Sequence, residues 1–317
     1  MSPAEIQERK QEIVEDSNLY AQAEAVPGMQ VQGYSDKDNI LAYNFDIVDG
    51  TPIEWTGIYK ESRVVGTESQ ESGVVGTESQ RDNSPEQTLH RAAGEHAEDV
   101  GNGTETQSLS TNEVQTSQDE KIWGDWDKQA ESDSLITTDD GNDLSWESKW
   151  KQDPNDLGNQ GLNTELTLRP YNTGLYPWLT NKAIIDVDFN GSTYDEISDY
   201  GPPNSIGSNT QSISLGLSSD EVVNVGVSSS TTSSNLDIDN KSDDDEDYVK
   251  IHFDISGDLR ENTVRLNQSA VTTGTEDSSD TTYCNQDLEA TFETLASHDG
   301  MPLEKESPSQ NIRMYWS

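Results

Sequence analysis

Apolar residues are spread thinly along this chain, and only a few stretches place them at a regular spacing. In residues 3–25, Ser2 and Pro3 suit the start of a helix, and Pro27 and Gly28 suit its end. Apolar residues recur between them at helical spacing and would form one narrow stripe. The stripe consists of Ile6, Ile13, Val14 and Leu19. A lone helix of this length is marginal in water, so residues 3–25 form either a transient solvated helix or a recognition helix that folds into a partner's groove.

The least polar stretch is Tyr43–Ile58, within residues 29–60. Apolar residues alternate before Asp49, a second short apolar run follows Gly50, and the Asp–Gly pair between them is a turn signal. The pattern indicates a weak hairpin, and two strands alone are barely stable in water. We therefore expect residues 29–60 to form a docking segment on a flexible chain.

The remaining segments offer fewer candidates for order. Residues 61–120 predict a polar linker, which contains the ten-residue tandem repeat ESRVVGTESQ–ESGVVGTESQ. Residues 121–189 are acidic and contain aromatic residues, and any small folded nucleus besides the N-terminal helix would lie in their most hydrophobic part, 162–189. Residues 190–306 predict a disordered acidic arm, and residues 307–317 form a tail without acidic residues. The tryptophans that could anchor a partner are Trp123, Trp126, Trp146 and Trp150.

Composition extends this picture to the whole chain. The 317 residues are 30% hydrophobic, their mean hydropathy is −0.85, and the formal net charge is −42. Ordering one residue costs roughly 1–2 kcal/mol of backbone entropy, and burial returns about 25 cal/mol per Å² of apolar surface. A chain this polar is not expected to offset that entropy throughout. The sequence therefore predicts a mostly intrinsically disordered protein with a short N-terminal α-helix and no large globular core.

The charge also indicates the class of partner. A chain at −42 repels nucleic-acid phosphates and anionic membranes and attracts basic protein surfaces. No apolar run is long enough to span a membrane, and the N-terminal segment has no apolar signal-peptide core, which favours a reducing compartment. The single Cys284 excludes an internal disulfide and a zinc site built from several cysteines. Without a coiled-coil repeat, we expect a monomer.

Catalytic and cofactor motifs are missing from the sequence. There is no glycine-rich phosphate loop and no nucleophile or metalloprotease motif. None of the four histidines has a metal-ligand spacing; they are His90, His96, His252 and His298. We therefore expect no enzyme activity, no cofactor and no metal. Ser242 precedes the acidic run DDDED and has the surroundings of a kinase substrate, although the same run could be an unmodified solvated stretch.

The stretch Tyr43–Ile58 resembles a short motif near the N-terminus of paramyxovirus phosphoproteins of the morbillivirus type. That motif reads roughly Tyr-x-Tyr-Asp-His-x-Gly, followed by a Val and a Gly-Ile pair. The matching residues are Tyr43, Phe45, Asp46, Gly50, Ile53, Gly57 and Ile58. Residues 194–222 are more loosely similar to a second stretch of that family, and the SDDDED run is similar to henipavirus arms. The sequence departs from the motif at its histidine, where Ile47 or Val48 stands.

The resemblance implies the shared N-terminal arm of such a phosphoprotein gene with a short private tail, as in its truncated W-type product. By resemblance, residues 3–25 would bind the viral nucleoprotein through their apolar stripe. Tyr43–Ile58 would bind host STAT-class transcription factors and antagonise interferon signalling, in the host cytoplasm or nucleus. The alternative is a cellular acidic disordered scaffold or transactivation segment that uses the tryptophans.

Overall fold

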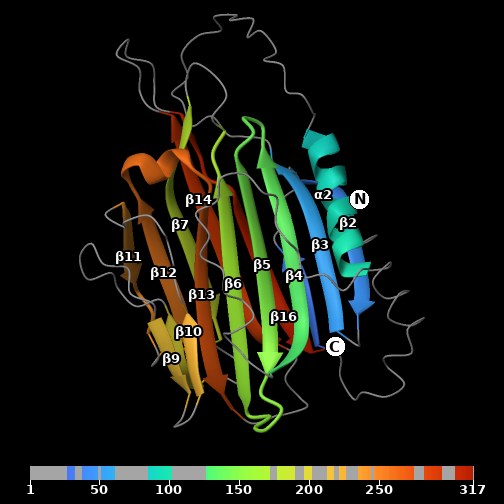
Figure 1. Ribbon diagram of the computed structural model, residues 1–317, viewed down its shortest axis with the longest axis vertical. Coiled ribbons are helices and arrows are strands. Elements are labelled where there is room, and N and C mark those ends of the chain that lie inside the picture. Colours follow the sequence, from blue (N-terminus) through green and yellow to red (C-terminus); the bar gives the residue numbers. More distant parts are fainter. Residues whose placement is uncertain are drawn as a thin grey trace, which may run out of the picture.

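Strands dominate the part of the chain that the computed structural model describes, and they form two large sheets (Figure 1). The prediction of a mostly intrinsically disordered chain is therefore wrong. The described residues are 27–32, 38–48, 51–60, 85–101, 126–171, 177–189, 196–201, 213–217, 221–225, 235–243, 246–274, 282–294 and 304–316.

One sheet, here called sheet A, has the strand order β1-β16-β14-β7-β12-β11, with β15 paired to β14. Its strands are β1 (Pro27–Gln32), β7 (Trp178–Asp188), β11 (Leu236–Asn240), β12 (Tyr248–Ile255), β14 (Thr282–Thr294), β15 (Lys305–Glu306) and β16 (Ser309–Trp316). All of these pairings are antiparallel. Because the first strand pairs with the last, sheet A combines segments from both ends of the chain.

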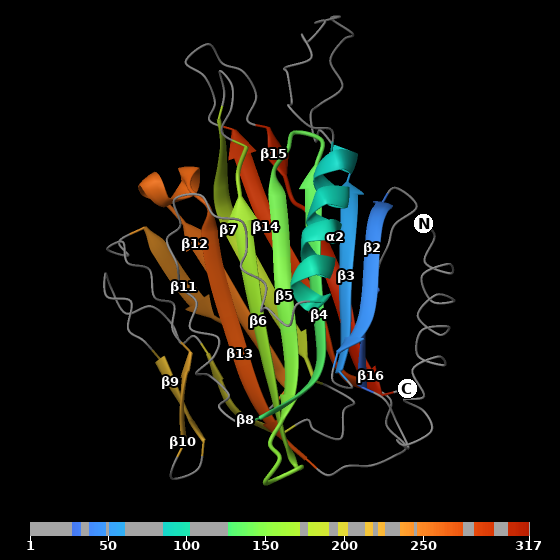
Figure 2. The same ribbon diagram turned by 45° about the vertical axis from the view of Figure 1, so that its right-hand side comes forward.

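The other sheet, sheet B, has the strand order β2-β3-β4-β5-β6-β13-β8. Its strands are β2 (Asp38–Val48), β3 (Thr51–Lys60), β4 (Asp127–Thr138), β5 (Asp143–Gln152), β6 (Asn159–Arg169), β8 (Glu196–Gly201) and β13 (Val264–Thr273). A separate hairpin consists of β9 (Ile213–Leu217) and β10 (Glu221–Val225), and η3 (Gly257–Glu261) is a short 3₁₀-helix. Figure 2 shows sheets A and B as two layers, with sheet B nearer the viewer.

Strands β3 and β4 are the one parallel pair among the described strands, and the helix α2 (Pro85–Gly101) lies between them in sequence. Parallel neighbours need a long crossover, which usually contains a helix. Helix α2 packs on the outer face of sheet B, where its Leu89 is fully buried against Ala42 and Trp55 (Figure 1). The segment 61–120, predicted as a polar linker, therefore contributes a crossover helix to the fold.

The main core lies between the inner faces of the two sheets. In β12, Val249, Ile251, Phe253 and Ile255 point inward and are buried, while the residues between them are more exposed. This alternation is typical of an antiparallel sheet that has one face in the core and one face exposed to solvent. Each strand of sheet A therefore needs an apolar residue at every second position only, which a chain with 30% hydrophobic residues can supply.

Trp146 and Trp150 belong to the core and are not solvated anchors for a partner. Trp150 is fully buried and stacks on Tyr283 with ring centroids 4.6 Å apart, and its Nε1 donates to Oε1 of Gln160 at 2.8 Å. Trp146 is also buried in the core, four residues earlier on β5. A spacing of four places two side chains on one face of a strand as well as of a helix. Trp126 is buried too, and Trp123 lies outside the described residues.

Other segment predictions also change. The hairpin indicated by the alternation in Tyr43–Ile58 is present as β2–β3, but it belongs to a large sheet. The arm 190–306 contains strands from β8 to β14, and the tail 307–317 supplies β16. The predicted N-terminal helix and the tandem repeat lie outside the described residues. In the described part of the chain, no helix has the length and apolarity to cross a membrane.

A folded chain with 61 acidic and 19 basic residues should depend on salt for its stability. Self-repulsion destabilises a compact state of high net charge, and the Debye length falls from about 10 Å at about 0.1 M salt to about 3 Å at about 1 M. We expect the midpoint of thermal unfolding, followed by circular dichroism, to rise across that range of sodium chloride. Potassium chloride should act equally, because screening depends on ionic strength. A midpoint that stays constant or falls would contradict this expectation.

Candidate functional site

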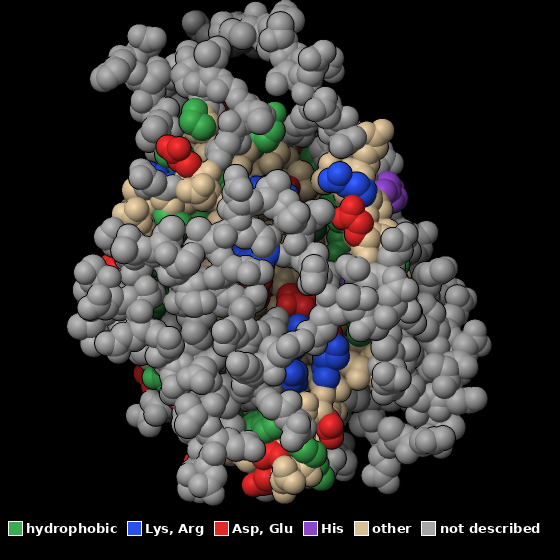
Figure 3. Space-filling model, viewed as in Figure 1, with side chains coloured by type: hydrophobic (Ala, Val, Ile, Leu, Met, Phe, Trp, Pro, Cys, Tyr) green, Lys and Arg blue, Asp and Glu red, His purple; other side chains and the backbone are tan. Residues whose placement is uncertain are grey.

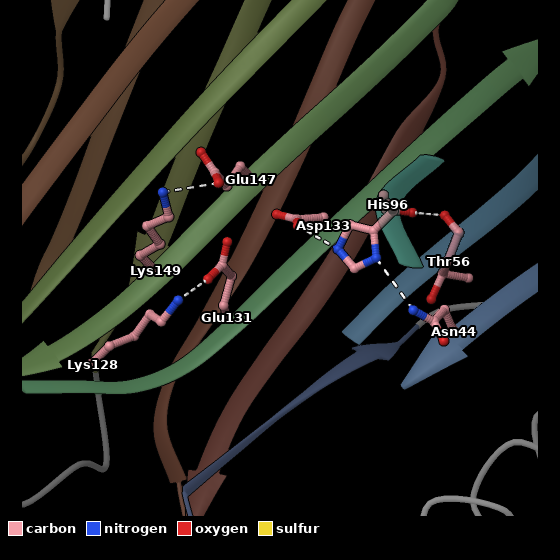
Figure 4. Close-up of polar contacts among 9 residues, drawn as sticks. Asn44, Thr56, His96, Lys128, Glu131, Asp133, Glu147 and Lys149 are labelled. Atoms are coloured by element: carbon pink, nitrogen blue, oxygen red, sulfur yellow. Dashed lines mark hydrogen bonds and ion pairs between the residues drawn. The ribbon is translucent and has the colours of Figure 1, made fainter. Parts of the chain in front are cut away.

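Six charged or titratable residues gather on the outer face of sheet B, beside α2 (Figure 4). They are His96, Lys128, Glu131, Asp133, Glu147 and Lys149, and we call them the ionic cluster. His96, Glu131, Asp133 and Lys149 are buried, with at most 9% of their surface exposed. Figure 3 shows charged side chains of both signs gathered over the middle of this sheet. Charges are seldom buried unless they are paired, so the pairing within the cluster decides what it can do.

The strand register explains why these residues meet. On β4, Glu131 and Asp133 point outward, because their neighbours Ala130 and Ser132 face the core. On β5, Lys149 lies directly opposite Glu131, and Glu147 lies opposite Asp133. Directly opposite residues have Cβ atoms about 4.5–5.5 Å apart. The two strands therefore present a two-by-two block of three carboxylates and one amine.

His96 connects this block to the helix. Its Nε2 lies 3.0 Å from Oδ2 of Asp133, and its Nδ1 lies 3.4 Å from Nδ2 of Asn44 on β2. Both contacts fit the tautomer in which Nε2 donates to Asp133 and Nδ1 accepts from the Asn44 amide. The ring also lies near Trp55, with centroids 6.2 Å apart. His96 thus ties α2 to strand β4 through a buried contact and to strand β2 through the half-buried Asn44.

Two lysines compensate the remaining carboxylates. Nζ of Lys149 lies 2.9 Å from Oε1 of Glu147, and Lys128 forms an ion pair with Glu131. Burial alone would raise the pKa of Glu131, but the charges of Lys149 and Lys128 outweigh it and lower that pKa. Glu131 is therefore ionised at neutral pH.

The donor set has the chemistry for a hard cation. Glu131, Asp133 and Glu147 each offer one carboxylate oxygen, and these oxygens lie within 4.8 Å of one another. Oxygen ligands of this kind suit calcium or magnesium. However, Lys128, Lys149 and His96 already pair with the same three carboxylates. The protein thus compensates the cluster with its own side chains, and the geometry is fully explained as a clamp between α2 and sheet B.

A second contact between carboxyl groups links the two sheets at one end. Glu306 of β15 is buried, and its Oε2 accepts hydrogen bonds from Oγ1 of Thr138 and Nδ2 of Asn142, both at 2.6 Å. Asp140, in the β4–β5 turn, lies against the same group. Burial, a hydrogen bond to Glu306 and the charges of Glu306, Glu304 and Asp139 raise the pKa of Asp140 to about 7. Asp140 is therefore partly protonated near neutral pH, at the end of sheet B where Thr138 and Asn142 hydrogen-bond to Glu306 of sheet A.

The outer face of sheet A differs from that of sheet B because it is open and acidic. Its outward positions include seven carboxylates on four strands, against three Lys or Arg residues. The carboxylates are Asp186, Asp188, Asp237, Asp239, Asp254, Asp287 and Glu289, and the cations are Lys182, Lys250 and Arg313. His252 adds no positive charge near neutral pH, because burial and the neighbouring Lys182, Lys241 and Lys250 lower its pKa.

The residues that matched the phosphoprotein motif do not form an exposed docking segment. Ile53 is buried, and Ile58 is fully buried in the main core. Gly57 leaves room for the Trp55 ring, because a Cβ at this position would lie 2.8 Å from that ring. Tyr43 and Phe45 are half-buried, and the backbone of Asp46 pairs with that of Ile53. Gly50 lies outside the described residues, as do the stripe residues Ile6, Ile13, Val14 and Leu19.

Ser242 lies in the connection between β11 and β12, and its hydroxyl has a structural role. Oγ of Ser242 accepts a hydrogen bond from the backbone N–H of Lys250 at 3.0 Å. Its own backbone N–H donates to Oδ1 of Asn240 at 2.9 Å. Ser242 therefore helps to close the β11–β12 hairpin. Phosphorylation at this position stays a prediction.

The ionic cluster was missed because its members are scattered in sequence. No metal-ligand spacing surrounds His96, because its hydrogen-bond partner Asp133 is 37 residues away in sequence. The signal that could have found the cluster is the placing of charges at alternate positions in two neighbouring strands. Glu131 and Asp133 show it in β4, and Glu147 and Lys149 show it in β5.

Comparison with known proteins gives no family for this chain. No family model and no curated protein matches it. Among solved structures, one that is similar is titled "Crystal structure of the RrgA Jo.In complex", at 12% sequence identity and a TM-score of 0.24. The match covers 53% of this chain and 78% of that one. A TM-score this low does not indicate a shared fold.

Substitution of His96 tests the clamp. His96→Ala would leave the Asp133 carboxylate buried without its imidazole donor, and a hydrogen bond to a charged group contributes about 1.5–3 kcal/mol. We expect His96→Ala to lower the free energy of unfolding by that amount in urea titrations. In the double variant with Asp133→Asn, the loss of unfolding free energy should be clearly smaller than the sum of the losses in the two single variants, because the residues are in contact. Additive losses would contradict the pairing.

Asp140→Asn tests the raised pKa of Asp140. The pKa of Asp140 is about 7 in the folded protein and ordinarily 3.8, so the folded state binds more protons between these values. Stability from this group is therefore full at pH below the ordinary pKa and is lost as the pH rises toward about 7. We expect Asp140→Asn to melt at a higher temperature than the wild type above about pH 7, with a smaller difference at about pH 5. A difference that does not change with pH would contradict the raised pKa of Asp140.

Proposed function

We propose that this protein is a non-enzymatic interaction module that binds cationic protein segments on the outer face of sheet A. The observation that carries this proposal is the unequal treatment of charge on the two outer faces. The face of sheet B pairs its carboxylates with lysines and a histidine and buries them. The face of sheet A carries more carboxylates than cations and leaves several of them exposed.

The register of sheet A places these carboxylates close together. Asp186 of β7 pairs directly with Asp287 of β14, and Asp188 and Glu289 lie on the same face two residues further along each strand. Neighbouring strands are about 4.8 Å apart, and like charges directly opposite one another destabilise a sheet. Asp186 is partly compensated by an ion pair with Lys250. Lysine or arginine side chains of a partner would relieve the remaining repulsion.

The face also has the shape and residue types of a binding surface. It spans the strands from β16 to β11, which at about 4.8 Å per strand is about 20 Å across. Ile184 lies near its middle, half-buried, and the half-buried Tyr248 and Tyr315 lie on β12 and β16, on either side of it. Aromatic residues are enriched among those that dominate binding energy. A basic segment could therefore combine charge pairing with contact to these side chains.

Burial of apolar residues within Tyr43–Ile58 removes the support for the phosphoprotein interpretation. It required exposed residues in Tyr43–Ile58 on an unfolded chain, whereas Ile53 and Ile58 are buried in sheet B. The cellular alternative relied on solvated tryptophans, and Trp146 and Trp150 are core residues. Attraction of basic protein surfaces was predicted from the net charge alone, so it depends on neither interpretation.

Charge-neutralising variants test the proposal. The face variant combines Asp188→Asn, Asp254→Asn and Asp287→Asn, all at exposed positions of sheet A. A matched control combines Glu95→Gln, Asp127→Asn and Glu196→Gln, on α2, β4 and β8. Both remove three negative charges, so they leave the same net charge. Affinity for a synthetic lysine-rich peptide is measured by calorimetry at low ionic strength.

We expect the face variant to bind the peptide about tenfold more weakly, which corresponds to about 1.4 kcal/mol, while the control loses little. Raising the salt concentration should weaken binding of the wild type, because exposed charges are screened. Equal losses in both variants would mean that the peptide follows net charge and not this face. That result would overturn the proposal.

A further inference from the structure

A row of polar side chains crosses the interior of the sandwich, where apolar residues would be expected. Strand pairing places Ser132 opposite Ser148, Ser148 opposite Thr164, and Thr164 opposite Gln268. The row therefore runs across β4, β5, β6 and β13 on the face that points toward sheet A. All four side chains are buried, with at most 2% of their surface exposed.

One residue of sheet A completes this row. Gln286 of β14 is fully buried, and its Oε1 accepts hydrogen bonds from Oγ of Ser148 at 3.0 Å and Oγ1 of Thr164 at 3.2 Å. At the far end, Nε2 of Gln268 donates to the backbone oxygen of Val249 on β12 at 3.1 Å. These bonds connect the two sheets through the centre of the core.

Several polar atoms beside these bonds have no hydrogen-bond partner among the described residues. They are Nε2 of Gln286, Oε1 of Gln268 and Oγ of Ser132, with Oγ1 of Thr56 and Nε1 of Trp146 next to them. Thr56 and Trp146 both pair with Ser134, two residues from Ser132 on β4. The unpaired atoms therefore lie over neighbouring positions of adjacent strands. Buried polar groups are nearly always paired, with protein or with ordered water.

We propose that this polar row is a binding site for water molecules held between the two sheets. The atoms offered are complementary, since Gln286 and Trp146 donate, Gln268 accepts, and the hydroxyls of Ser132 and Thr56 can do either. Neither Gln286 nor any of the four side chains of the row carries a charge, and the nearest carboxylate in the strand register is that of Glu54 on β3, which is buried and pairs with Ser132 at the end of the row. Water can both donate and accept, and buried waters typically make about three hydrogen bonds to such groups. The site is independent of the acidic outer face.

Oxygen-17 magnetic relaxation dispersion of the full chain measures the number of long-lived bound waters. We expect the wild type to hold such waters and Gln286→Met to lose part of that signal. Ile185→Val changes the packing of the same core without removing a polar group, so it serves as the matched control and should keep the signal. An unchanged signal in Gln286→Met would overturn the proposal.

Ser132→Ala gives a second, milder test should Gln286→Met fail to fold. If Ser132 binds water, its removal lowers the thermal midpoint and reduces the long-lived water signal. If its hydroxyl is unpaired in a dry core, its removal raises the midpoint or leaves it constant, since a buried unpaired polar group is unfavourable. That second result would overturn the proposal. Native mass spectrometry of the purified protein that shows a bound small organic molecule would overturn it as well, by placing another neutral ligand in the row.

Discussion

Adhesion between the inner faces of the two sheets is the interaction on which the rest of the structure depends. Trp150 of sheet B stacks on Tyr283 of sheet A. Phe189 packs edge-to-face with the same tyrosine ring, with ring centroids 5.5 Å apart. Aromatic residues of this size bury about 150–250 Å² each. Only when this contact has formed do the outer faces become fixed surfaces, one covered by α2 and the other left acidic.

Part of this fold was readable from the sequence. The alternation in Tyr43–Ile58 is that of β2 and β3, and Tyr248–Ile255 shows the same pattern in YVKIHFDI. The composition predicted disorder instead, because it averages apolar residues over the whole chain. A sheet needs them on one face only, and sheet B also places Ser132, Ser148, Thr164 and Gln268 in the interior. Disorder was inferred from the low average hydrophobic content of the chain, but a two-layer sandwich can form at that content.

The sites were less predictable than the strands. The ionic cluster requires His96 to meet Asp133 across a crossover, and no local spacing signals that contact. The stretch Tyr43–Ile58 presents a related difficulty. Aromatic and apolar residues that would mark an interface in an unfolded chain also mark a buried strand, and Ile58, at zero exposure, is the latter. Only tertiary partners distinguish the two.

The pairing of β1 with β16 has a consequence for how the chain folds. Pro27 is the register partner of Trp316, so a ribosome must complete almost the whole sequence before the first strand finds its neighbour. Sheet A cannot close from one end while synthesis continues, because β16 lies between β1 and β14. Contacts between residues so far apart in sequence slow folding. Until then β14 lacks its neighbour on one edge, and the high negative charge of the chain would keep such intermediates apart.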